Sequence, residues 1–257
     1  MRILCIGDVV GTAGCEFLRR RLPALKKLHK VDLTIVNGEN AADGNGITPR
    51  AADHIFTSGA DVITLGNHSF RRPEIHAYLE EQPCIIRPLN YPSSQTPGKG
   101  ICTVDMGYTR VTVVNLLGQE AIDVRADNPF TAMERLLPQI DSKIVILDFH
   151  AEATSEKRAM GLWLDGKVSA VFGTHTHVMT ADAEVLPGGT GYITDVGMTG
   201  PIDSVLGVKK EIIINRFLTK LPARFEYENT ASKMDCVLFD IDRSTGRCTA
   251  ATSFELR

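Results

Sequence analysis

The 257-residue sequence lacks the features of a membrane protein or a secreted protein. No apolar run approaches the roughly 20 residues that a membrane-spanning helix needs, and the first residues, MRILCIGDVVG, carry no small-residue cleavage site. The six cysteines are scattered without a C-x-x-C pair, so neither a disulfide framework nor a thiolate zinc site is indicated. We therefore expect a cytoplasmic protein whose cysteines are small buried groups.

The sequence also lacks an excess of charge of either sign. Its formal net charge is -3, and 23% of its residues are charged. A protein that binds nucleic acid electrostatically is normally strongly basic, so we expect no stable nucleic-acid complex. A small anionic substrate stays possible, because a bound cation can reverse the field of one pocket.

What the sequence does have is an alternation of short apolar strands and amphipathic helices. The pattern predicts strands at residues 2–7, 33–36, 62–65, 101–105, 111–117, 144–149, 168–172 and 192–195. It predicts helices at residues 15–29, from Pro49 after a Thr48 cap, and at 73–81, 128–140, 156–164 and 209–218, with a strand as the alternative for the last.

Further expectations concern the first helix, the C-terminal tail and the fold class. Pro23 predicts a kink or a shortened first helix, and the C-terminal tail alternates around a Ser-Thr-Gly turn, which predicts a hairpin. Alternating units of this kind predict an α/β fold with much parallel sheet. Strands that are apolar throughout predict helices on both sides of the sheets, and residues 1–257 show no linker that would divide them into domains.

Polar side chains follow five of the predicted strands. They are Asp8, Glu39, Asn40, Asn67, His68, His150, His175 and His177. Ligands of α/β sheets bind at the carboxyl ends of the strands, so we expect these side chains to converge. A glycine precedes most of them, which lets the chain turn sharply and leaves room for a ligand.

Mixed oxygen and imidazole donors suit manganese, iron or zinc. The donors outnumber the ligands of one tetrahedral ion, so we expect two ions. A lone aspartate after a strand more often caps a turn, but packing explains the joint pattern poorly. His29, His54 and His76 lie on predicted helices, and we expect them to be structural.

A family resemblance rests on the same residues. The stretches GDVVG, NGENAADGNGIT, GNHSF, GTHTHVMTAD and TDVGMTGPIDSVLG resemble the YmdB-type branch of the calcineurin-like metallophosphoesterases. The broad superfamily has Asp-x-His, GDxxD and GHxH where this chain has GDVV, GEN and GTHTH, and these departures agree with the narrower branch. The resemblance implies a single metallophosphoesterase domain of two facing mixed β-sheets flanked by helices, a four-layer α/β/β/α sandwich.

The resemblance also implies a role for each residue. One ion would be held by Asp8, Glu39, Asn40 and His177. The second would be held by Asn67, His150 and His175, with Glu39 bridging the two. His68 would be left free for proton transfer. The implied metals are iron or manganese, with zinc or magnesium possible, and the implied assembly is a homo-oligomer.

The implied activity is that of a phosphodiesterase, with 2′,3′-cyclic nucleotides as the leading substrate. Two cations would lower the pKa of a bridging water, whose hydroxide would attack phosphorus. His68 would protonate the leaving ribose oxygen. Two alternatives stay open: a phosphomonoesterase or 5′-nucleotidase would use the same donors, and a regulatory protein could keep the metal site without turnover.

Two further groups of residues have no settled interpretation. Arg87, Asn90 and Tyr91 precede a long middle loop and could line a substrate pocket, although an ordinary surface loop explains them equally well. Thr176 and Asp195 could orient the imidazoles from outside the set of ligands.

Overall fold

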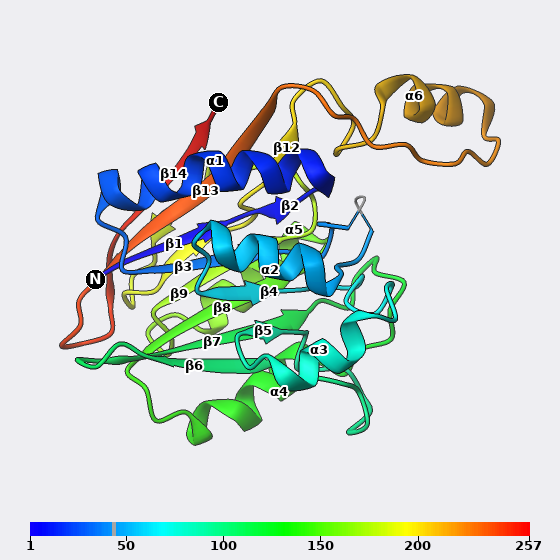
Figure 1. Cartoon of the computed structure of the whole chain (residues 1–257). Helices are drawn as coiled ribbons and strands as arrows, with labels where there is room; N and C mark the ends of the chain where they lie inside the picture. Colours follow the sequence, from blue (N-terminus) through cyan, green and yellow to red (C-terminus); the bar gives the residue numbers. More distant parts are fainter. Residues whose placement is uncertain (43–44) are drawn as a thin grey trace.

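Two β-sheets face each other in the computed structural model of the protein, which describes residues 1–42 and 45–257 (Figure 1). The first sheet joins, in spatial order, β2 (Asp8–Val9), β12 (Met198–Pro201), β13 (Ser232–Ile241), β1 (Arg2–Ile6), β3 (Leu33–Asn37), β4 (Val62–Thr64) and β5 (Ile85–Ile86), and β14 (Cys248–Leu256) pairs with β13. The second joins β10 (Glu184–Val185), β11 (Gly191–Ile193), β9 (Ala170–Thr174), β8 (Ile144–His150), β7 (Arg110–Leu117) and β6 (Ile101–Asp105).

Both sheets mix parallel and antiparallel strands. In the first, β1, β3, β4 and β5 run parallel, and β13 runs antiparallel to β1. In the second, β7, β8, β9 and β11 run parallel, and β6 is antiparallel to β7. The parallel strands of each sheet therefore deliver their carboxyl ends to one edge, where ligands bind in α/β folds.

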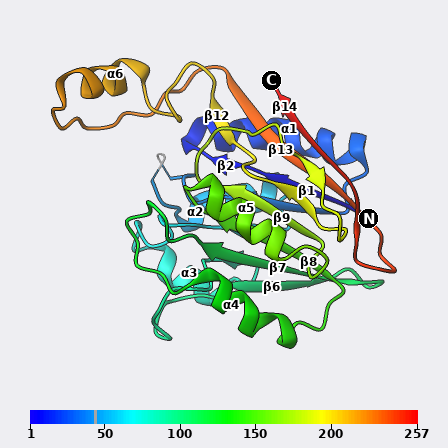
Figure 2. The same cartoon turned by 180° about the vertical axis from the view of Figure 1, so that it is seen from behind.

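Helices cover the outer face of each sheet. The first sheet carries α1 (Gly11–His29), α2 (Pro49–Ser58) and α3 (Ile75–Glu81), and the second carries α4 (Pro129–Leu136), followed by a 3₁₀ turn at Leu137–Gln139, and α5 (Thr154–Trp163) (Figures 1 and 2). The expected four-layer α/β/β/α sandwich is confirmed. In both views α6 (Lys210–Thr219) stands away from the sandwich. No helix of the described ranges is long and apolar enough to cross a bilayer.

Three apolar clusters hold the layers together. Successive residues of a strand point to opposite faces, so Ile3 and Cys5 of β1 enter the core between the sheets, whereas Leu4 and Ile6 pack under α1. The strand β8 alternates in the same way between the inner core and the core beneath α4 and α5. Strands buried on both faces leave polar side chains little room except at the strand ends.

Most elements lie where the sequence predicts them. The side chain of Thr48 accepts a hydrogen bond from the backbone N–H of Ala51 and caps α2 as expected. The C-terminal hairpin is confirmed as β13 and β14. The segment from Lys210 is helical, so the strand alternative is wrong. The sequence pattern did not predict the short strands β2, β5, β10 and β12, because two to four residues are too few to show a period.

The first helix ends at His29, as predicted, but begins at Gly11 rather than Cys15. Pro23 was expected to cause a kink or a shortened helix, and the shortened helix is wrong because α1 continues past Pro23. Proline costs a helix about 3 kcal/mol. The apolar face of α1, with Leu18, Leu22 and Leu25 buried against the sheet, stabilises the helix by more than that amount, since each buried leucine contributes roughly 1.5–3 kcal/mol.

Candidate metal centre

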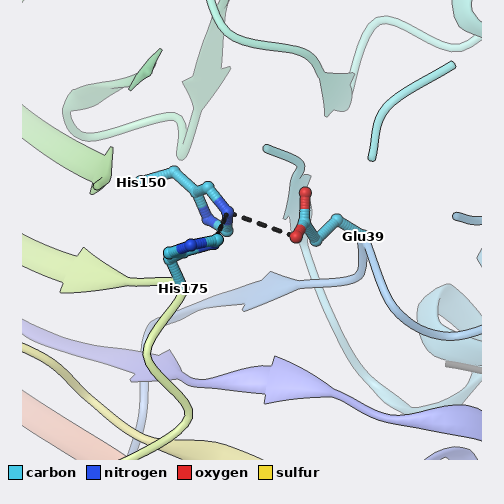
Figure 3. Close-up of side chains that lie close together, drawn as sticks. All are labelled: Glu39, His150 and His175. Atoms are coloured by element: carbon cyan, nitrogen blue, oxygen red, sulfur yellow. Dashed lines mark hydrogen bonds and ion pairs between the residues drawn. The ribbon is translucent and has the colours of Figure 1, made fainter. Parts of the chain in front are cut away.

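The five predicted strand ends meet between the two sheets. Glu39 follows β3 of the first sheet, whereas His150 ends β8 of the second and His175 follows β9 (Figure 3). Their side chains point toward one another across the gap between the sheets. Residues more than a hundred positions apart in the chain are thus brought into contact. We call the seven expected ligands the donor cluster: Asp8, Glu39, Asn40, Asn67, His150, His175 and His177.

One half of the donor cluster surrounds Nε2 of His150. That nitrogen lies 3.2 Å from Oε1 of Glu39, 3.0 Å from Nδ1 of His175 and 3.0 Å from Oδ1 of Asn67. Ligand atoms of Glu39, His150 and His175 lie within 4.8 Å of one another. Donors bonded to one ion at about 2.0–2.2 Å are separated by roughly 3–4 Å, so this group has the spacing of a metal site.

The other half of the donor cluster surrounds the amide of Asn40. Its Nδ2 lies 3.3 Å from Oδ1 of Asp8, 3.3 Å from Oε1 of Glu39 and 3.2 Å from Nε2 of His177. Nε2 of His177 lies 3.6 Å from Oδ1 of Asp8. Oε1 of Glu39 therefore contacts both halves of the donor cluster.

His68 lies beside this shared carboxylate. Its Nδ1 is 2.8 Å from Oδ1 of Asn40 and 3.4 Å from Oε1 of Glu39, and its backbone N–H donates to Oε2 of Glu39 at 2.9 Å. The Asn40 oxygen can only accept, so the proton of a neutral His68 ring sits on Nδ1 in this arrangement. Turning the amide over would present its NH₂ group to His68 and move that ring proton to Nε2.

Charge compensation holds the donor cluster together. Burial opposes the charged form of Glu39, but the positive charge and hydrogen bond of His150 prevail and lower the pKa of Glu39 to about 2. Burial likewise opposes a charged His150, yet Glu39 raises the pKa of His150 to about 9, so a metal ion bound by His150 would displace a proton. For His175, burial and the charge of His150 lower the pKa to about 3, so its ring is neutral and can bind a cation at neutral pH.

A family model described as YmdB-like protein matches residues 4–254. The chain belongs to this family. It is 47% identical to the 2′,3′-cyclic-nucleotide 2′-phosphodiesterase of Bacillus subtilis (strain 168), over 95% of this chain and 93% of that protein.

Solved structures agree with this family. The structure described as a novel phosphatase from Mycoplasma pneumoniae has a TM-score of 0.95 at 33% identity, over 100% of this chain and 93% of that one. The calcineurin-like phosphoesterase YfkN of Bacillus subtilis shares the fold at 11% identity, with a TM-score of 0.60 over 100% of this chain and 90% of that one.

Close packing in this YmdB-like protein explains the glycine before Asn67. A Cβ atom on Gly66 would lie 2.4 Å from Oε2 of Glu39 and 2.4 Å from the ring of His150. Any side chain at this position would push the carboxylate and the imidazole apart. The glycine therefore brings the two halves of the sandwich close enough for their donors to meet.

The loop after β9 holds both of its histidines in an uncommon conformation. The φ angles of His175 and His177 are 100° and 62°, in the region that L-residues rarely adopt. Asp195 supports the loop by accepting from the backbone N–H of Thr176 at 3.1 Å, and Lys157 of α5 pairs with Asp195 at 2.6 Å. Asp195 thus contacts the backbone between the two histidines rather than an imidazole.

Behind His150 lies a chain of buried polar groups that the sequence pattern did not predict. Nδ1 of His150 lies 2.8 Å from Oγ1 of Thr174, which donates to Asp148 at 2.7 Å. Thr64 and Asn37 donate to the same carboxylate. Burial raises the pKa of Asp148 to about 6. The signal was present in the sequence, because Asp148 interrupts the otherwise apolar strand IVILDFH.

The remaining sequence candidates lie in the loop beside the donor cluster or on helices. Arg87 donates to the backbone oxygens of Pro88 and Leu89, and Asn90 donates to that of Leu117 at 2.7 Å. The hydroxyl of Tyr91 lies 3.5 Å from the backbone oxygen of Gly66. These contacts order the loop beside the donor cluster. His29, His54 and His76 lie on α1, α2 and α3, as expected of structural histidines.

Proposed function

We propose that the protein is a metal-dependent phosphodiesterase that hydrolyses 2′,3′-cyclic nucleotides at a two-metal centre. The observation that supports this best is the position of Glu39, whose Oε1 contacts donors of both halves of the cluster. A carboxylate shared between two sets of oxygen and imidazole donors is typical of two-metal hydrolases. The name of the Bacillus subtilis relative, a 2′,3′-cyclic-nucleotide 2′-phosphodiesterase, supports the substrate class.

The donor cluster has the chemistry that iron or manganese prefers, and zinc or magnesium also fit it. One ion would be held by Asp8, Glu39, Asn40 and His177. The other would be held by Glu39, Asn67, His150 and His175. When bound, such ions neutralise phosphate oxygens and lower the pKa of water.

His68 is the proposed proton donor to the leaving ribose oxygen. It borders the same cavity as the donor cluster, and burial lowers its pKa, which makes its imidazolium form a stronger acid. Oδ1 of Asn40 and Oε1 of Glu39 lie beside Nδ1 of His68 and would accept the Nδ1 proton of that imidazolium. The proton on Nε2 would then be the one donated, which returns the ring to its neutral form.

A substrate panel with the manganese-loaded protein tests this function. We expect the protein to hydrolyse the diester bis-p-nitrophenyl phosphate but not the monoester p-nitrophenyl phosphate. We also expect it to hydrolyse 2′,3′-cyclic nucleotides but not 3′,5′-cyclic nucleotides. The expected product is the 3′-monophosphate, and elemental analysis should find two metal ions per chain. Hydrolysis of the monoester alone would identify a phosphomonoesterase, and bound metal without turnover would identify a regulatory protein.

We also propose that residues 1–257 form one domain that assembles as a homo-oligomer in the cytoplasm. A single cooperative unfolding transition would support the one domain. Light scattering that returns the monomer mass of 28.1 kDa would contradict the oligomer.

A further inference from the structure

A cavity of about 380 Å³ adjoins the donor cluster. Its polar side contains Glu39, His68, His175 and His177. Its opposite side is formed by the segment between β12 and β13, residues 202–231, which we call the arm. The cavity is within the size range of small-molecule sites, about 300–1,000 Å³. A ligand held by the donor cluster would therefore extend toward the arm.

The arm is a structured unit that stands out from the sandwich (Figures 1 and 2). Its two extended segments are joined by backbone hydrogen bonds, from Lys209 N–H to the oxygen of Glu226 and from Glu228 N–H to the oxygen of Gly207, both at 2.9 Å. The helix α6 lies at its end. The arm thus holds its own shape and can present side chains toward the cavity.

The side chains that the arm presents are unusual for this chain. Only 6% of the residues are aromatic, yet Phe217, Phe225 and Tyr227 all line this cavity. We call these three the aromatic wall. Phe217 is 66% exposed and Phe225 is 39% exposed, so their rings are accessible to a ligand. The guanidinium of Arg216, which also lines the cavity, lies 5.2 Å from the ring centroid of Phe225.

We propose that the aromatic wall binds the purine or pyrimidine base of the substrate by stacking, with Arg216 beside it. This inference rests on the proposed function, because it places the cyclic phosphate at the donor cluster. The base and the phosphate of a nucleoside 2′,3′-cyclic phosphate are attached to the same ribose ring, so the base must lie in the same cavity. Aromatic rings can stack on any of the nucleic-acid bases, because every base has a π-face.

The test compares a substrate that has a base with one that lacks it. In the manganese-loaded full-length protein, Phe225→Ala should reduce kcat/KM for 2′,3′-cyclic AMP by about 5- to 150-fold, mainly through KM. The same variant should leave kcat/KM for glycerol 1,2-cyclic phosphate unchanged. Phe225→Tyr keeps a ring and should retain most of the wild-type value.

Leu218→Ala is the matched control. Leu218 lies on α6 next to Phe217 and is 80% exposed, but the side chains that line the cavity do not include it. We expect this variant to behave as wild type with both substrates. Equal losses of Phe225→Ala on both substrates would overturn the proposal. An accompanying change of molar mass would show that the arm assembles copies of the chain instead.

Calorimetry separates this proposal from the proposed function. The wild-type protein should bind adenosine 3′-monophosphate more tightly than inorganic phosphate, and Phe225→Ala should remove most of that advantage. If the protein hydrolyses no cyclic nucleotide but shows these two binding results, the proposed function is wrong and the proposed base site is supported. If the variant binds the nucleotide as tightly as wild type does, the base site fails whatever the activity.

Discussion

The side chains of Glu39 and His150 are fully buried between the sheets, whereas Phe217 and Leu218 on the arm are 66% and 80% exposed. Each imidazole of the donor cluster contacts a charged or amide neighbour, and a further layer of polar groups supports it. The arm contacts mostly itself. The donor cluster is therefore positioned by the whole sandwich, whereas the arm is positioned mainly by its own few hydrogen bonds.

This difference suits the two regions to different roles, with the reaction at the donor cluster and binding of the substrate at the arm. Buried charges tolerate little change, because an unpaired buried charge is costly. Exposed side chains away from such features usually change stability by about 0.5 kcal/mol or less. We expect substitutions in the donor cluster to abolish metal binding or turnover, and substitutions on the arm to alter affinity for the substrate.

The largest effect is expected from Glu39→Gln, because the variant removes the carboxylate whose Oε1 contacts both halves of the donor cluster. Bound metal should fall below two ions per chain by elemental analysis, and turnover should fall to the background rate. Glu134→Gln, an exposed glutamate on α4, is the control and should change neither. A Glu39→Gln protein with full metal content and wild-type turnover would contradict the assignment of the shared carboxylate.

His68→Ala should have the next largest effect. The loss of a general acid should reduce kcat by about 10²–10⁴-fold, while the metal content stays at the wild-type value. His29→Gln, at the far end of α1, is the control. Native-rate hydrolysis of a diester with a poor leaving group by His68→Ala would exclude the proton-donor role.

Lys157→Ala tests the support behind the histidine loop. Both partners of the Lys157–Asp195 pair have side chains only 1% exposed, so the variant leaves Asp195 buried and unpaired. We expect a loss of about 3–5 kcal/mol in the free energy of unfolding. Lys210→Ala removes an exposed pair on the arm and should leave the denaturation midpoint unchanged. Equal midpoints for the two variants would show that the buried pair does not stabilise the loop.

The smallest effect is expected from Leu218→Ser. This exposed leucine lies outside the cavity, so the free energy of unfolding should change by about 0.5 kcal/mol or less, with kcat and KM unchanged. Chemical denaturation and kinetics with 2′,3′-cyclic AMP measure both. A loss of several kcal/mol would mean that the arm is packed against another surface in solution.

Much of the fold and of the site was predictable. Strands buried on both faces appear in the sequence as continuous apolar runs. The polar residues that follow these runs are therefore easy to recognise, and they include the residues of the donor cluster. Short strands such as β12 could not be predicted, since four residues show no periodicity and pairing with β13 decides them. The shortening expected at Pro23 does not occur, because tertiary packing outweighs the local cost of proline.

The sequence by itself determined which side chains come at the ends of strands, because alternation and turn residues are local properties. Only the tertiary structure decided that Glu39 of the first sheet contacts His150 of the second, since that contact depends on how the two sheets face each other. The same holds for Lys157 behind the histidine loop and for the aromatic wall opposite the donor cluster. A local sequence pattern indicates whether a residue lies in a strand, a helix or a turn. Which residue it contacts depends on packing between segments far apart in the chain.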